Sequence, residues 1–231
     1  MSKLEVSDKN PVFSDSINPV RAYRVYDIIA IAFVSLLLLS NIAATKLIAF
    51  NVGDFPLVFD GGAILFPMTY VLGDVLSEVY GFKKARRAIL LGFFYSILAS
   101  VVFLLVAVAP PGPGYENQAA FEAVLGFVPR IVAASLAAYM VGQLLNSWIL
   151  VSIKRKFGEK HLWARLMGST VVGELADTII FCTIAFYGVV TNDVLLNYIV
   201  VGYIYKVAVE FLIMPITYPT IHYVKKLEGV K

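Results

Sequence analysis

Charge is scarce in this sequence. Only 15% of its 231 residues are Asp, Glu, Lys or Arg, and 59% are hydrophobic. Soluble domains contain about 25% charged and about 45–50% apolar residues. The shortage of charge excludes a soluble enzyme, and the surplus of apolar residues excludes a disordered chain. The composition is typical of a protein embedded in a membrane.

Cysteine and histidine are almost absent. A single cysteine, Cys182, excludes an internal disulfide and any cysteine-based zinc or iron–sulfur site. Its apolar neighbours indicate a packing role. The two histidines, His161 and His222, lie on different segments without a cluster of further ligands. We therefore expect no metal site and no cofactor.

Six long apolar runs dominate the chain. Each is long enough to cross the hydrocarbon core, which needs about 20 apolar residues in a helix. The runs are continuously apolar, whereas barrel strands alternate in polarity, so we expect an all-α fold. The first run is longer than the apolar core of a secretory signal and is expected to be retained. The runs cover residues 26–48, 57–80, 87–109, 129–153, 166–190 and 198–224.

The basic residues between the runs fall on one side. All 19 Lys and Arg except Lys46, Arg130 and Lys206 precede the first run, follow the sixth, or lie in the second-to-third and fourth-to-fifth connections. This asymmetry places both chain termini in the cytoplasm. The sequence thus predicts a polytopic bundle of six transmembrane helices over residues 26–224, with cytoplasmic segments 1–25 and 225–231. The basic connections are too short to fold into a nucleic-acid-binding domain, so no nucleic acid is expected as a partner. The apolar runs are expected to lie in the lipid bilayer.

Ionisable residues inside the runs are candidates for function. A charged side chain within hydrocarbon costs about 2.5–3.5 kcal/mol, so these residues must face a partner or a cavity. Glu174 and Asp177 share one helix face near mid-depth, and Lys206 and Glu210 share another. Two carboxylates beside one lysine leave spare acceptors, which suits a ligand rich in hydrogen-bond donors. The alternative is a set of structural ion pairs between helices.

A second acidic pair, Asp74 and Glu78, lies near the cytoplasmic end of the second run. It is close in sequence to a basic turn that contains Arg86, so it could form structural ion pairs or a cytoplasmic gate. Lys46 lies near the outer end of the first run, where its ammonium could reach the interface. Gly61, Gly62 and Pro67 predict an irregular outer half for the second helix.

These motifs resemble a known family. The run from Phe66 to Arg86, which reads FPMTYVLGDVLSEVYGFKKAR, resembles the signature of the queuosine-precursor transporters, also called the VUT family. The resemblance extends over nearly all of residues 35–222. Further matches follow in order: Ser40-Asn41-Ile42 with Lys46, Ala138-Tyr139 with Gly142-Gln143, Gly173-Glu174 with Asp177-Thr178, and Lys206 with Glu210 before Pro215.

The resemblance implies a substrate and a site. The substrate would be a 7-deazaguanine (the 7-cyano form, the 7-aminomethyl form or queuine), imported across the inner membrane for queuosine modification of tRNA. Glu174 and Asp177 would accept the donors of its guanine-like edge, and Lys206 or Gln143 would donate to its carbonyl. An aromatic ring such as Phe66 or Tyr70 would stack on the base. Asn41 and Glu210 complete the expected set, and no residue is expected to be catalytic.

Two other functions compete with this hypothesis. A substrate-binding subunit of an energy-coupling-factor vitamin transporter also has six spans and would need an ATPase module. Such subunits often carry an Ala-x-x-x-Ala pattern on the first helix, but here Ala30 is followed by Val34. An intramembrane aspartyl protease would need a Gly-x-Gly-Asp motif, and Val71 replaces its first glycine. The identity of the precursor and the formation of a homodimer stay open at this stage.

Overall fold

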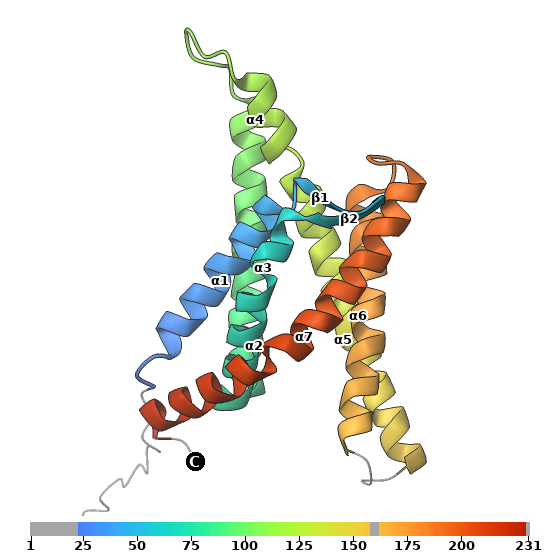
Figure 1. Cartoon of the computed structure of the whole chain (residues 1–231). Helices are drawn as coiled ribbons and strands as arrows, with labels where there is room; N and C mark the ends of the chain where they lie inside the picture. Colours follow the sequence, from blue (N-terminus) through green and yellow to red (C-terminus); the bar gives the residue numbers. More distant parts are fainter. Residues whose placement is uncertain (1–22, 158–161, 230–231) are drawn as a thin grey trace, which may run out of the picture.

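The computed structural model describes residues 23–157 and 162–229. Most of the predicted N-terminal segment 1–25 lies outside the described residues, and so does His161. The chain is mainly helical, with one small β-hairpin (Figure 1). The elements follow in this order: α1 (Tyr26–Ala43), β1 (Leu47–Val52), β2 (Phe55–Asp60), the 3₁₀ helix η1 (Gly61–Ile64), α2 (Phe66–Tyr80), α3 (Phe82–Val108), α4 (Gln118–Leu125), α5 (Val128–Phe157), α6 (Leu162–Phe186) and α7 (Asn192–Glu228).

The hairpin corrects the predicted ends of two helices. The helix of the run 26–48 ends at Ala43, and the helix of the run 57–80 begins only at Phe66. Between them β1 pairs antiparallel with β2, from Leu47 opposite Asp60 to Val52 opposite Phe55. Gly53 has a φ of 62° in the two-residue loop, a conformation that glycine adopts without strain. The all-α prediction omitted this hairpin because its apolar strands read as parts of helices.

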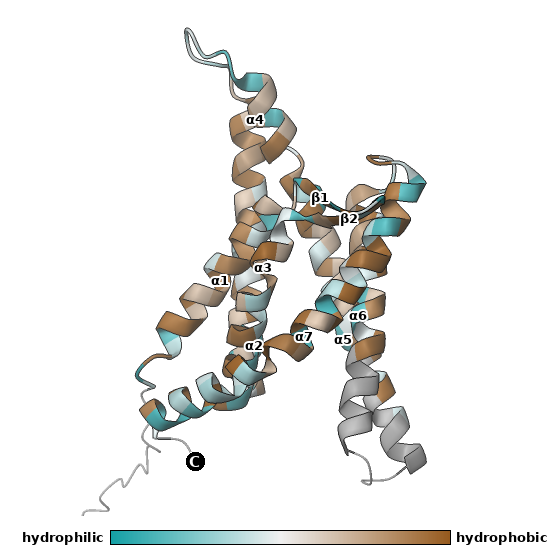
Figure 2. Ribbon diagram, in the orientation of Figure 1, coloured by the Kyte–Doolittle hydropathy of each residue, from teal (hydrophilic) through white to brown (hydrophobic). Residues whose placement is uncertain are grey.

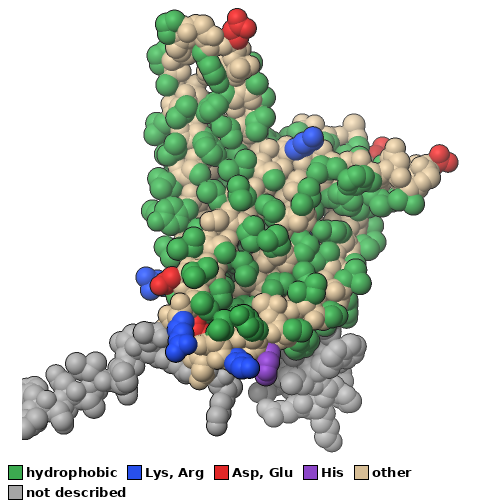
Figure 3. Space-filling model, turned by 60° about the vertical axis from the view of Figure 1, so that its left-hand side comes forward, with side chains coloured by type: hydrophobic (Ala, Val, Ile, Leu, Met, Phe, Trp, Pro, Cys, Tyr) green, Lys and Arg blue, Asp and Glu red, His purple; other side chains and the backbone are tan. Residues whose placement is uncertain are grey.

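The helices present apolar surface on the outside. Among the residues with described side chains, four helical stretches are long and apolar enough to cross a membrane: Tyr26–Ala43, Phe82–Val108, Gln118–Leu145 and Asn192–Glu228. Hydrophobic residues cover most of their length (Figure 2). Hydrophobic side chains are spread over one face of the molecule, which shows few charged side chains between its two ends (Figure 3). A surface of this kind is stable in lipid, so the chain is a membrane protein.

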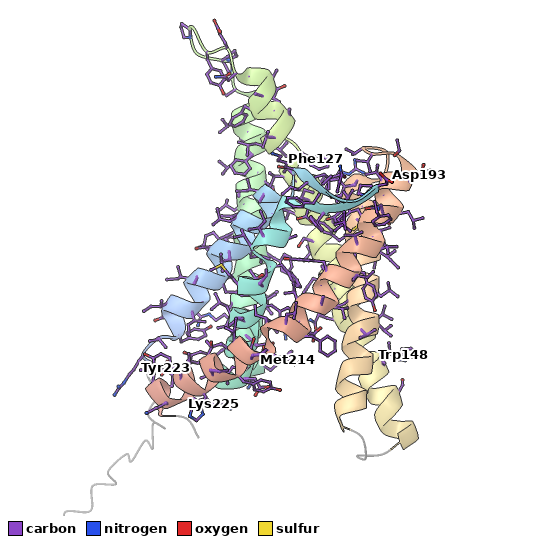
Figure 4. All side chains as sticks on the ribbon, viewed as in Figure 1. Phe127, Trp148, Asp193, Met214, Tyr223 and Lys225 are labelled. Atoms are coloured by element: carbon purple, nitrogen blue, oxygen red, sulfur yellow. The ribbon has the colours of Figure 1, made fainter. Side chains whose placement is uncertain are left out.

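Helix α7 changes direction along its 37 residues (Figure 1). Pro215 and Pro219 lie inside it, and each removes a helical hydrogen bond and bends the axis. Met214 lies close to this bend, with Tyr223 and Lys225 in the segment beyond it (Figure 4). The bend lets the first part of α7 pack along α6 while the second part reaches the start of α1.

Two close approaches hold the hairpin over the centre of the bundle. The amide of Asn197 on α7 donates to the Pro56 carbonyl at 2.9 Å and accepts from the Val58 N–H at 3.2 Å. A Cβ at Gly61 would lie only 2.5 Å from the Ala43 carbonyl oxygen, so only glycine allows η1 to rest directly on α1. Together these contacts bring Asp60, the last residue of β2, toward the interior.

Candidate functional site

A cavity of about 230 Å³ lies at the centre of the bundle. Its walls come from α1, β2, η1, α2, α3, α5, α6 and α7, so every long helix contributes. Apolar and aromatic side chains such as Leu37, Phe59, Phe93 and Phe181 form much of the lining. The polar members of the lining are Ser40, Asn41, Asp60, Thr69, Ser135, Tyr139, Asp177, Thr178, Tyr198, Tyr205 and Lys206. An apolar pocket with convergent polar groups is typical of a small-molecule site.

Lys206 of α7 connects the cavity to two acids of α6. Its ammonium donates to the Asp177 carboxylate at 2.5 Å and lies 3.7 Å from Oε2 of Glu174. The spacing of three residues puts both acids on the face of α6 that meets α7. Glu174 Oε2 is buried and accepts no hydrogen bond from the described residues. One cation is therefore shared by two carboxylates.

Asp60 places another carboxylate at the cavity wall. One oxygen accepts a short hydrogen bond from the Tyr198 hydroxyl, and the other accepts the Ala63 N–H at 3.2 Å, which caps η1. Both donors are neutral. Burial raises the pKa of this carboxyl, which lies in the connection between α1 and α2. Sequence reasoning missed Asp60 because it was assigned to a helix; the available signal was an Asp before two glycines, which is typical of a cap and a turn.

The structure brings four of the eight expected binding residues to the cavity: Asn41, Phe66, Asp177 and Lys206. The Asn41 amide donates to the Ser96 hydroxyl at 3.1 Å, which ties α1 to α3. The ring of Phe66 lies 5.6 Å from the Lys206 ammonium, within the range of a cation–π contact. An aromatic face and the main cation of the site therefore adjoin.

The other four expected binding residues lie outside the cavity lining. Glu174 lies 3.7 Å from the Lys206 ammonium. Glu210 follows Lys206 by one turn of α7, and its carboxylate lies close to the Tyr70 side chain. Gln143 is exposed on α5. The neighbour of Gln143, Gly142, meets α6 instead, because a Cβ there would lie 3.2 Å from Cβ of Asp177.

The expected gate residues do not pair with the basic turn. Asp74 is half-buried, whereas Glu78, Arg86 and Lys46 are exposed. Among the described residues, no ion pair joins Asp74 or Glu78 to the basic residues of the α2–α3 turn.

A different carboxylate joins three helices at the end of the bundle where α7 finishes. Glu228, at the end of α7, accepts the N–H groups of Arg24 and Val25 at 2.8 and 2.9 Å. It also accepts the Tyr80 hydroxyl at 2.9 Å. The C-terminal end of α7 is thereby tied to the start of α1 and the end of α2.

Comparison with known proteins identifies the family. Residues 60–220 match the sequence profile of a family described as "Putative vitamin uptake transporter". The chain belongs to this family. The family resemblance inferred from the motifs is thereby confirmed. Asp60, Asp177 and Lys206 all lie within the matched segment.

Three relatives carry more specific names. A "Probable queuosine precursor transporter" of Bacillus subtilis is 33% identical over 180 residues, which cover 78% of this chain and 79% of the relative. A protein of the same name from Haemophilus influenzae is 31% identical over 134 residues, 58% of this chain and 54% of the relative. The "Queuosine precursor transporter" of Escherichia coli is 29% identical over 126 residues, 54% of each chain. No solved structure matches the chain.

Proposed function

We propose that this protein imports a queuosine precursor, a 7-deazaguanine base, across the inner membrane. The observation that carries the proposal is the central cavity, where Lys206, Asp177 and Asp60 converge with aromatic rings in about 230 Å³. The names of the three relatives support the same substrate class. A flat base with N–H donors on one edge and a carbonyl beside them matches this mixture of carboxylates, ammonium and aromatic walls.

Side chains in and beside the cavity contact different parts of the base. Asp177, with Glu174 behind it, accepts the ring N–H and the exocyclic amine in charge-assisted hydrogen bonds. Lys206 donates to the carbonyl oxygen of the base. Phe66 stacks on the ring, which is worth about 1–3 kcal/mol by analogy with bases bound to proteins. Glu210 and Tyr70 lie next along the bundle and form part of the route by which the base leaves toward the cytoplasm.

The proposed topology has six spans, formed by α1, α2, α3, α5, α6 and α7, with both termini in the cytoplasm. In Figure 1 the hairpin, α4 and the α6–α7 turn lie at one end of the bundle, and the α2–α3 turn and the end of α7 lie at the other. This arrangement supports the topology, since the first set of connections carries no Lys or Arg apart from Lys46 and Arg130 at the helix ends. α2 is short, about 22 Å over 15 residues, and η1 and the hairpin complete its path.

Cysteine labelling tests the topology. In a Cys182→Ser background, single cysteines at Val52, Tyr115 and Asp193 are expected to react with an impermeant maleimide added to intact cells. Cysteines at Lys83 and Lys226 are expected to react only after the membrane is opened. Labelling of the second set in intact cells, with protection of the first, would reverse the orientation.

Uptake of a radiolabelled 7-deazaguanine tests the function. The full chain is expressed in a host that cannot make the precursor and lacks its own importer. We expect accumulation of the base and appearance of queuosine in tRNA, both absent with an empty vector. The host should contain no ATPase module of the energy-coupling-factor type, because uptake that requires such a module would favour the competing assignment. Absence of binding and of uptake by correctly inserted protein would overturn the proposal.

A further inference from the structure

The charges that line the cavity do not balance. Among the described lining residues, the acids are Asp60 and Asp177 and the basic residue is Lys206. Lys206 is committed to Asp177 at 2.5 Å and is approached at 3.7 Å by Glu174, which adds another negative charge. The ammonium is thus neutralised on the α6 side. The charge of Asp60 is left without a cation in direct contact.

The two hydrogen bonds to Asp60 do not replace a cation. Tyr198 and the Ala63 N–H are neutral donors, and they bond to different carboxylate oxygens. The Gly62 N–H, which is also neutral, lies close to the same carboxylate. Two carboxylate oxygens have about four acceptor sites, so room is left for a further donor. A carboxylate removed from water is costly unless it is paired with a positive charge. The wall at Asp60 is therefore complementary to a cationic group.

The turn that carries Asp60 is built for close approach. A Cβ at Gly62 would lie 2.7 Å from Oδ1 of Asp60 and 2.7 Å from the Ser40 hydroxyl oxygen. Glycine at this position lets the carboxylate and the hydroxyl of α1 adjoin at the cavity wall. Since Ser40 is itself a lining residue, it supplies a further acceptor for an N–H donor beside Asp60.

From this geometry we infer that Asp60 is the counter-ion for an ammonium group on the transported base, so that the site selects an aminomethyl-type substrate over a neutral one. The inference rests on the proposed function and extends it to substrate selection. The base edge lies against Lys206 and Asp177, and the substituent with its positive charge lies toward Asp60 and Ser40. The hairpin thus contributes specificity from outside the helices.

Binding of matched ligands to the purified full chain tests this role. The probes are 7-aminomethyl-7-deazaguanine, which carries an ammonium, and the 7-hydroxymethyl analogue, which is similar in size but neutral. The wild-type protein is expected to bind the ammonium form about 10- to 150-fold more tightly, the range for a hydrogen bond to a charged group. Asp60→Asn should remove most of this preference, because it should weaken binding of the ammonium form far more than binding of the neutral analogue. Asparagine keeps an acceptor for the Ala63 N–H and therefore preserves the cap.

Asp54→Asn is the matched control. Asp54 lies in the same hairpin but is exposed at its tip, so this variant makes the same change in charge away from the cavity. It should retain the wild-type preference. Equal affinity of the wild-type protein for the two ligands would overturn the inference without any variant, and so would a preference that survives in Asp60→Asn. A wild-type protein that binds neither ligand would contradict the proposed function itself.

Discussion

Replacing Lys206 with methionine is expected to abolish uptake and to destabilise the folded protein by at most about 3–5 kcal/mol, the range for a fully buried pair. Removal of one partner of a buried ion pair leaves the other as an uncompensated buried charge. Without Lys206, two carboxylates would lose their cation, because Asp177 lies 2.5 Å and Glu174 lies 3.7 Å from the Lys206 ammonium. Methionine matches the length of the lysine stem, so the effect reports on charge more than on packing. Unfolding of the purified protein in detergent measures it.

Two further variants show whether the loss of stability comes from unpaired carboxylates. Lys46→Met removes a positive charge from an exposed position and should change stability by less than about 0.5 kcal/mol. Adding Asp177→Asn to Lys206→Met should recover part of the lost stability, because one of the two unpaired carboxylates is then neutral. If Lys206→Met were as stable as Lys46→Met, the charges of Glu174, Asp177 and Lys206 would not form a stabilising, partly buried cluster.

Helical periodicity explains why this cluster could be predicted from the sequence. Residues three or four positions apart share a face of a helix, and charges within an apolar run must find partners. Glu174, Asp177 and Lys206 satisfied both conditions on two helices, and the structure brings them together. Gln143 carries no charge, so the second condition did not apply to it. Adjacent helical residues point about 100° apart, so the contact of Gly142 with α6 turns Gln143 away from it.

Contacts between distant segments could not be predicted in this way. Asp60 reaches the cavity because a hairpin, rather than a helix, fills the space between α1 and α2. Its partner Tyr198 is 138 positions away along the chain. The contact at the end of α7 is similar, because Glu228 accepts a hydrogen bond from Tyr80 across 148 positions. The sequence instead suggested the basic turn as a partner for Asp74, because the two are close along the chain. The spacing of residues along one helix does not indicate which distant segment of the chain packs against it.

Asp177→Asn is expected to weaken binding of a 7-deazaguanine by about 10- to 150-fold, the loss of a hydrogen bond to a charged group. Asp177 lines the cavity, and its carboxylate both orients Lys206 and faces the ligand. Asparagine keeps the shape of the side chain, and Glu174 remains close enough to Lys206 to balance its charge. The variant should therefore fold and insert normally. Equilibrium binding to the purified protein measures the effect.

Comparing Glu174→Gln with Asp177→Asn shows which of the two carboxylates contacts the ligand and which only balances the charge of Lys206. Glu174 lies outside the cavity lining and 3.7 Å from the Lys206 ammonium, so its neutralisation should weaken binding less than Asp177→Asn does. Asp193→Asn provides the control: Asp193 is exposed at the start of α7 (Figure 4), and its replacement should leave affinity unchanged. Normal affinity in folded Asp177→Asn would assign the acids to helix packing. A larger loss in Glu174→Gln than in Asp177→Asn would instead move the base one turn along α6, toward Glu210 and Tyr70, since the carboxylate that contacts the donors must be the one whose charge matters most.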